Sequence, residues 1–175
     1  MGRMSHAQAP QSFGRVDDDG TVYVRTSDGE RSVGQVPDST SEEALEFFVR
    51  RYRALETEVS LLESRVSSGT ASPEEARSAA SKLVTSIREA NAVGDLESLA
   101  ARVEALTPTI DAKAETRREE RAEAKARAKQ AKEEMVAQAE AIAAGSDWRG
   151  GIGKFRDLLD QWRRLPVSYT HLRAH

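Results

Sequence analysis

Apolar residues recur at alternating intervals of three and four along the first half of the chain, which is the spacing of one buried face of an α-helix. The first of these seams lies between residues 40 and 66 and has heptad spacing. Thr40 and Glu43 have the spacing of a capping box before it, and Gly69 follows it, so the pattern predicts one long helix. The seam consists of Leu45, Phe48, Tyr52, Leu55, Val59, Leu62 and Val66.

Two further helices are predicted within residues 40–110, which we assign to a helical hairpin and a third helix. The short link that ends at Ser72 favours an antiparallel coiled-coil hairpin, and Pro73 suits the first helical position. Pro108 lies within the third pattern, where it either kinks one long helix or begins a new helix after Thr107. The seams are Ala76, Ala80, Leu83, Ile87 and Ala90, and then Leu96, Leu99, Val103, Leu106 and Ile110.

The N-terminal part has a different pattern. Residues 1–12 are small and polar, so we predict that they are disordered. Residues 13–36 contain short β-prone runs separated by two Asp-Gly turn signals, at Gly20 and Gly29, and predict a three-stranded β-meander. Such a sheet is too small to be stable alone, so it should dock on the helices. The acidic run before Gly20 lacks the ligand spacing of a calcium loop, so we interpret it as a turn.

A long charged helix is predicted for residues 111–144. Its first part combines alanine with charged residues, and an apolar face returns at Met135. Residues 146–166 contain a further apolar stripe that ends at Trp162. We expect Trp148 and Trp162 to be buried anchors rather than platforms for stacked bases.

Composition excludes several classes of protein. The 175 residues include no Cys, which rules out a disulfide scaffold, a zinc ribbon and a thiol nucleophile. No apolar run approaches the roughly 20 residues of a membrane span. Met1 to Pro10 lacks the apolar core of a signal peptide. The net charge of −3 does not by itself indicate a nucleic-acid-binding protein. We therefore expect a cytoplasmic protein without a membrane contact.

No set of residues predicts a catalytic site. His6 lies in the segment predicted to be disordered, and no serine or carboxylate pattern completes a triad with it. The glycine-rich stretch 150–154 follows a helical pattern rather than a strand, so it suits a weak helix or a loose loop better than a phosphate-binding loop. We expect no enzyme, no cofactor, no metal and no small-molecule substrate.

The charges of residues 111–134 are segregated. On a helical wheel, seven basic residues fall within about 160° of arc, and most acidic residues lie opposite. Like charges four residues apart repel, so the arrangement predicts a partner for this face. The partner is either a phosphate backbone or an oppositely charged helix of this chain or of another copy, unless the helix is a solvated spacer. The candidate contact residues, the basic stripe, are Lys113, Arg117, Arg118, Arg121, Lys125, Lys129 and Lys132.

Three blocks carry a resemblance to a known family. Residues 13–25, residues 91–95 and the "Asp-Trp … Leu-Leu-x-x-Trp" pattern from Asp147 to Trp162 resemble actinobacterial members of the bacterial domain-of-unknown-function family 349. The resemblance implies that residues 146–166 are the first half of a repeated helical unit. It implies no activity. Some members have the label "DNA repair ATPase", but this chain has no G-x-x-x-x-G-K-[ST] loop.

The last residues, 167–175, match nothing before them and resemble a translated sequencing adapter. We expect this tail, with His171 and His175, to be non-native and the chain to be an N-terminal fragment. The expected fold is mainly α: a small N-terminal β-meander, an antiparallel coiled-coil helical hairpin, and a long charged helix leading into a truncated helical repeat.

The expected function is a non-enzymatic cytoplasmic helical scaffold or adaptor, with a protein partner or self-association through helices. The alternatives are an electrostatic nucleic-acid- or ribosome-associated factor and a non-catalytic regulatory partner of an ATPase.

Overall fold

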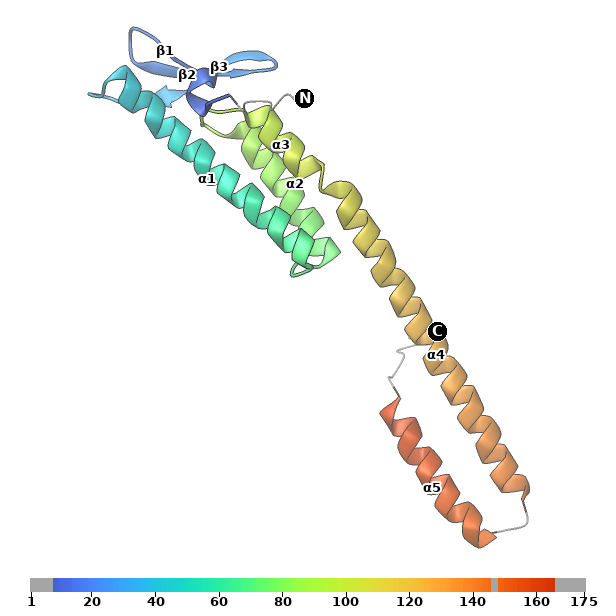
Figure 1. The fold of residues 1–175 in the computed structure, drawn as a ribbon. Helices are drawn as coiled ribbons and strands as arrows, with labels where there is room; N and C mark the ends of the chain where they lie inside the picture. The colour runs from blue at the N-terminus through green and yellow to red at the C-terminus, as the bar shows by residue number, and fades with distance from the viewer. Residues whose placement is uncertain (1–7, 146–147, 166–175) are drawn as a thin grey trace, which may run out of the picture. The chain divides into compact units, whose positions relative to one another are not determined.

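The computed structural model describes residues 8–145 and 148–165, with the side chain of Trp148 excepted. The chain is mainly helical with one small antiparallel sheet, and its contacts divide it into two units, up to Ala114 and from Glu115 (Figure 1). The predicted tail, residues 167–175, lies outside the described residues. The elements are η1 (Pro10–Phe13), β1 (Gly14–Val16), β2 (Thr21–Thr26), β3 (Gly29–Gln35), α1 (Ser41–Ser68), α2 (Pro73–Glu89), α3 (Leu96–Glu104), α4 (Thr107–Ala144) and α5 (Trp148–Arg164).

The predicted β-meander is confirmed. The strands are antiparallel in the order β1-β2-β3, and Gly14 pairs with Val24. Asp19 Oδ1 accepts a hydrogen bond of 3.0 Å from the Thr21 amide, and Gly20 adopts φ +84°, so the acidic run forms a turn. Val22 and Val24 are fully buried, which docks the sheet on the helices as expected for three short strands.

The segment before the sheet differs from the predicted disorder. Residues 1–7 lie outside the described part, but Pro10–Phe13 form a 3-10 helix. Gln11 Nε2 donates a hydrogen bond of 3.4 Å to Glu46 Oε2 on α1, and Phe13 packs against the core. The polar composition of residues 8–12 could not predict this 3-10 helix, because the contacts that hold it are to a helix more than 30 residues away in the sequence.

The helix ends follow the local sequence signals. Capping boxes join Thr40 to Glu43 and Ser72 to Glu75, and Gly69 ends α1 in the left-handed conformation with φ +74°. Asp95 caps α3 through a hydrogen bond of 3.1 Å from the Ser98 amide. At the third seam, α3 ends at Glu104 and α4 begins at Thr107, so Pro108 lies in the first turn of a new helix.

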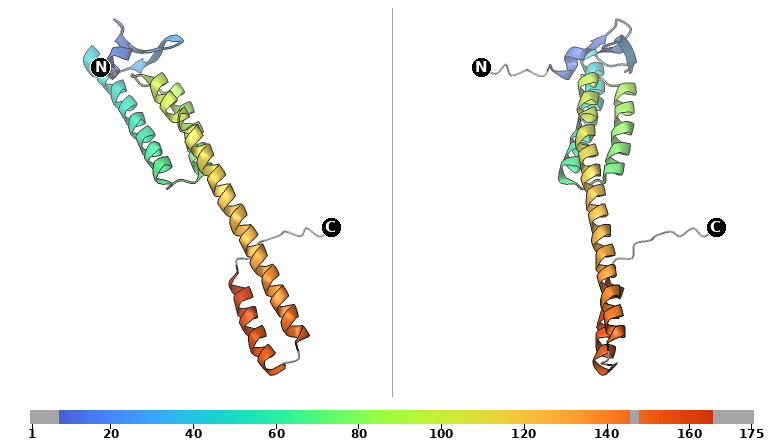
Figure 2. Two further views of the ribbon diagram at one scale, coloured as in Figure 1. Left: turned by 45° about the vertical axis from the view of Figure 1, so that its right-hand side comes forward. Right: turned by 90° about the vertical axis from the view of Figure 1, so that its right-hand side faces the viewer.

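Helices α1, α2 and α3 lie side by side and close the core of the first unit (Figures 1 and 2). The predicted seams face one another, although Leu45, Leu55, Ala90 and Leu106 are only partly buried. The antiparallel α1–α2 hairpin is confirmed, whereas the interlocked side-chain packing of a coiled coil stays a prediction. The buried seam residues are Phe48, Tyr52, Val59, Leu62, Val66, Ala76, Ala80, Leu83, Ile87, Leu96, Leu99, Val103 and Ile110.

The link between α2 and α3 packs tightly on α1. The Val93 amide donates a hydrogen bond of 3.1 Å to the Phe48 carbonyl, and Tyr52 Oη donates one of 3.5 Å to the Asp95 carbonyl. Burial raises the pKa of the Tyr52 phenol. Gly94 lies against the Tyr52 ring, where a Cβ would have no room. This link therefore fixes the start of α3.

In the second unit, α5 runs antiparallel to the last turns of α4 (Figures 1 and 2). Among the described side chains of α5, from Arg149 onward, only Leu158 is buried, so the two helices form an open hairpin. Within the described ranges, no helix is long and apolar enough to cross a membrane.

Removal of a capping side chain should destabilise the first unit measurably. Ser72→Ala should lower the free energy of unfolding by about 1 kcal/mol, because the Glu75 amide loses its acceptor. Urea unfolding followed by circular dichroism at 222 nm measures the change. The control is Ser78→Ala, an exposed site in the same helix, which should lose no stability. Equal losses in the two variants would contradict the capping role.

Candidate functional site

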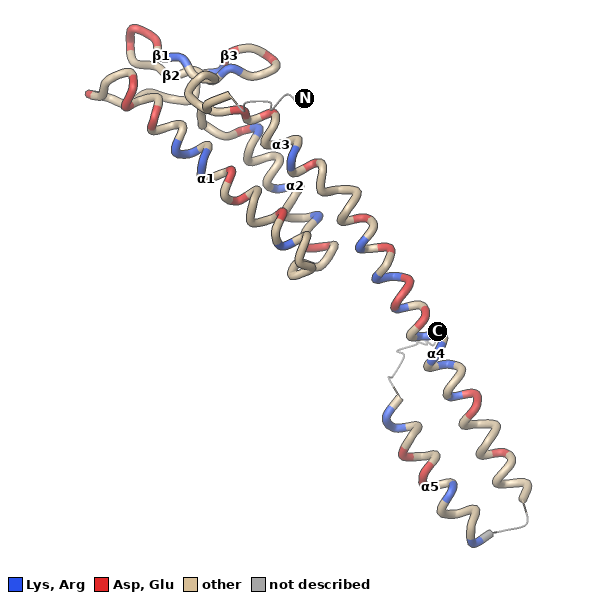
Figure 3. The backbone as a smooth tube through the Cα atoms, in the orientation of Figure 1, with Lys and Arg blue, Asp and Glu red and all other residues tan. Residues whose placement is uncertain are grey.

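The basic stripe lies on α4, where Lys, Arg, Asp and Glu are interspersed along the helix (Figure 3). Lys113 belongs to the first unit, and its Nζ donates hydrogen bonds to the Val66 carbonyl and, at 3.3 Å, to the Ser67 carbonyl. A cation at the C-terminal end of α1 binds carbonyls of the last helical turn and interacts favourably with the helix dipole. Lys113 therefore has a structural role that its place on the stripe did not reveal.

Several other stripe residues have partners within the second unit. Arg118 pairs with Glu115 at 2.9 Å and Lys129 with Glu133 at 3.9 Å, both along the helix. The Nζ of Lys132 lies 5.8 Å from the centre of the Trp162 ring, a cation–π contact. Arg117 also has an interaction partner. These contacts reduce the number of cations that a phosphate backbone would meet unpaired.

Arg121 and Lys125 form the part of the stripe that stays open. Both side chains are exposed, and neither forms an ion pair with any residue that the structure describes. Two such cations one helical turn apart give a weak, salt-sensitive attraction to anions. The seven predicted residues thus all lie on α4, but they do not share one role.

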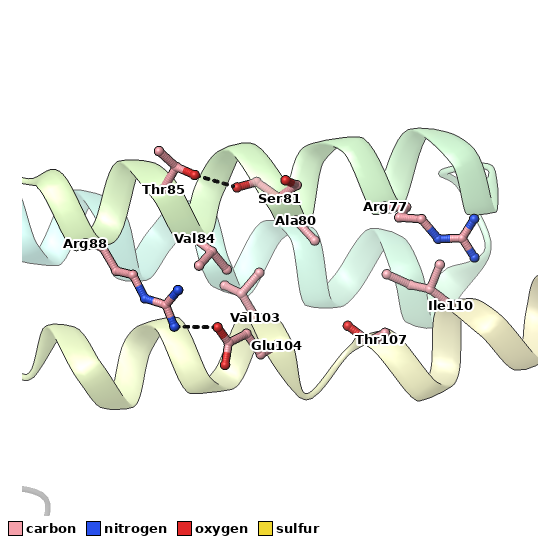
Figure 4. A pocket seen from close by; sticks show the side chains of 10 residues that line it. All are labelled: Arg77, Ala80, Ser81, Val84, Thr85, Arg88, Val103, Glu104, Thr107 and Ile110. Carbon is pink, nitrogen blue, oxygen red and sulfur yellow. Dashed lines mark hydrogen bonds and ion pairs between the residues drawn. The ribbon is translucent and has the colours of Figure 1, made fainter.

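The first unit has a crevice between α2 and the α3–α4 junction, with a volume of about 370 Å³ (Figure 4). Val84, Val103 and Ile110 supply apolar walls. Ion pairs join Arg88 to Glu104 at 2.6 Å and Arg77 to Asp111 at 2.7 Å. The charged groups of the crevice therefore neutralise one another and leave shape and apolar surface as its main features.

The second unit has a groove that the sequence did not predict. This hairpin groove lies between α4 and α5, has a volume of about 170 Å³, and is lined by Met135, Val136, Ala139, Phe155, Leu158, Leu159 and Trp162. Trp162 is 41% exposed, so its predicted role as a buried anchor is wrong, because α4 is the one helix beside it among the residues that the structure describes. The side chain of Trp148 lies outside the described residues. The other exposed large apolar side chains of this face are Val136 at 45%, Ile152 at 58%, Phe155 at 48% and Leu159 at 46%.

The remaining candidate sequences form ordinary structure. Gly150 to Lys154 are part of α5, so this stretch is a helix rather than a loop. In the described part of the chain, no group of three or more His, Asp or Glu side chains could hold a metal ion.

Comparison with known proteins identifies the family of the helical part. Residues 98–167 match the family model described as Domain of Unknown Function (DUF349), a segment that begins within α3 and includes α4 and α5. No curated protein and no solved structure matches the chain. The third block of resemblance, from Asp147 to Trp162, lies within this segment, whereas the blocks at residues 13–25 and 91–95 precede it, so residues 98–167 are the part of the chain that belongs to the DUF349 family.

Proposed function

We propose that this chain is a non-enzymatic cytoplasmic scaffold or adaptor that holds a protein partner through its second unit. The observation that supports this proposal is the hairpin groove, where four large apolar side chains stay 41–48% exposed. Contiguous exposed apolar surface of this kind usually marks a site of protein association. The seams of the first unit are closed, so they support the fold rather than a partner.

The use of the charged residues supports a binding role over catalysis. Arg77 and Arg88 of the crevice form ion pairs, and Lys113 binds helix carbonyls. Exposed ion pairs of this kind add little stability, but they occupy the charged side chains of the crevice.

A second candidate function rests on Arg121 and Lys125, the exposed and unpaired part of the basic stripe. These two residues would contact a phosphate backbone without sequence selectivity, as in an electrostatic nucleic-acid factor. The scaffold proposal ranks first, because tight binding to a phosphate backbone needs several unpaired cations and only Arg121 and Lys125 are unpaired among the described stripe residues.

Nucleic-acid binding discriminates the two functions. Fluorescence anisotropy with labelled duplex DNA and RNA at 50 and 200 mM salt should show no more than weak binding, with a loss below about tenfold on adding salt. The variant Arg121→Glu/Lys125→Glu should behave like the original chain, and Glu119→Lys/Glu123→Lys serves as the opposite control. Tight binding that falls about 1,000-fold with salt and disappears in the first variant would overturn the scaffold proposal.

A further inference from the structure

We propose that the hairpin groove is the contact surface for the hairpin groove of a second copy of this chain. Two copies would form a four-helix assembly around a two-fold axis that runs along the helices. This inference deepens the proposed scaffold function, on which it rests, by naming the partner. Pairs of antiparallel helical hairpins commonly bury their apolar faces in this way.

The side chains of α5 define one edge of the groove. Leu158 is buried against α4, and a Cβ on Gly151 would lie 3.3 Å from Ile142 Cγ2, so these two positions point toward α4. At 100° per residue, the exposed Ile152, Phe155 and Leu159 lie on the next quarter of the helix surface. Beyond them, at intervals of seven, lies a basic rim that consists of Arg149, Arg156 and Arg163.

The side chains of α4 define the opposite edge. Val136 is exposed and lines the groove with Met135 and Ala139. Outside Val136 on the helical wheel lie Glu133 and Glu140, again seven residues apart, which we name the acidic rim. Lys129 also lies at this edge and pairs with Glu133 at 3.9 Å, so the edge as a whole carries a net charge of −1. The groove therefore has one basic and one acidic rim.

These rims discriminate between the two ways of stacking the hairpins. A two-fold axis along the helices places α5 of one copy on α4 of the other, so the basic rim meets the acidic rim twice. A two-fold axis across the helices places α5 on α5, so arginines meet arginines. Exposed ion pairs add little stability, but juxtaposed like charges are costly, so the rims select the first arrangement.

The axial positions of the charges also match. Trp162 lies beside Lys132, and Gly151 lies beside Ile142, which fixes the level of every α5 residue along α4. Arg163 is then level with position 131 and Arg156 with position 138. Because a two-fold axis along the helices preserves these levels, each arginine lies about 3 Å along the axis from a glutamate of the other copy, Glu133 or Glu140.

The first test is the mass of the chain in solution. Sedimentation equilibrium of the chain should give a concentration-dependent mass that approaches twice that of one chain. Leu159→Glu should weaken dimer formation at least about 30-fold, because it buries a charge at the centre of the groove. Gln161→Glu adds the same charge to α5 away from the groove and should keep the dimer. A chain that stays monomeric, or a Leu159→Glu variant that still dimerises, would overturn the proposal.

The second test concerns the rims. Arg156→Glu/Arg163→Glu and Glu133→Arg/Glu140→Arg should each be monomeric alone, because each would oppose like charges. Their equimolar mixture should recover a heterodimer, since both rim contacts then join opposite charges. Circular dichroism must show unchanged helix content in each variant. Two variants that dimerise alone as well as together would contradict this arrangement, whereas the scaffold proposal depends on the nucleic-acid experiment and would survive.

Discussion

Replacement of Ile87 by alanine should lower the free energy of unfolding by about 3–5 kcal/mol. Ile87 is fully buried and is among the largest side chains with no exposure, in the α2 seam that faces α1 and α3. Removing three carbon atoms there loses their transfer free energy and leaves a cavity, because the packed helices relax only in part. Urea unfolding followed by circular dichroism at 222 nm measures the loss.

A matched truncation on the surface provides the control. Leu61 on α1 is 60% exposed, so Leu61→Ala removes an aliphatic side chain of the same size without opening a cavity. We expect a change below about 1 kcal/mol in that variant. A loss of similar size in the two variants would mean that α2 does not pack on the first unit as described.

The local features of this fold could be predicted from the sequence. Capping residues such as Thr40 and Ser72 act within one helical turn, and an Asp-Gly turn acts within four residues, so their signals are complete in a short window. The heptad seams are also local, because a helix with one apolar stripe must bury it. The order of strands and the α1–α2 hairpin followed from short links between these elements.

The tertiary uses of particular residues could not be predicted in the same way. Lys113 donates to carbonyls of α1 that lie 46 and 47 positions earlier, so no helical wheel could show that it leaves the basic stripe. The apolar stripe of α5 was visible in the sequence, but its exposure depends on how many helices surround it. The hairpin groove was missed for that reason, because periodicity gives the direction of a face and not what covers it.

Gly94 lies in residues 91–95, one of the three blocks of resemblance in the sequence, and the structure gives it a steric role. A Cβ at this position would lie within 3.0 Å of three ring atoms of Tyr52. The Tyr52 ring cannot move away easily, since the side chain is 8% exposed and its hydroxyl bonds the Asp95 carbonyl. Gly94→Ala should therefore cost about 2–3 kcal/mol of stability, through overpacking rather than backbone strain.

The coupling between the two residues provides the decisive test of this steric explanation. Tyr52→Ala removes the ring, so Gly94→Ala should cost less than about 1 kcal/mol in that background, and the two single losses should exceed the loss in the double variant. Gly153→Ala is the control, because nothing lies near its Cβ position in α5 and alanine favours the helix. Additive losses at Gly94 and Tyr52, measured by urea unfolding, would show that Gly94 is needed for another reason and that the ring does not set the position of the α2–α3 link.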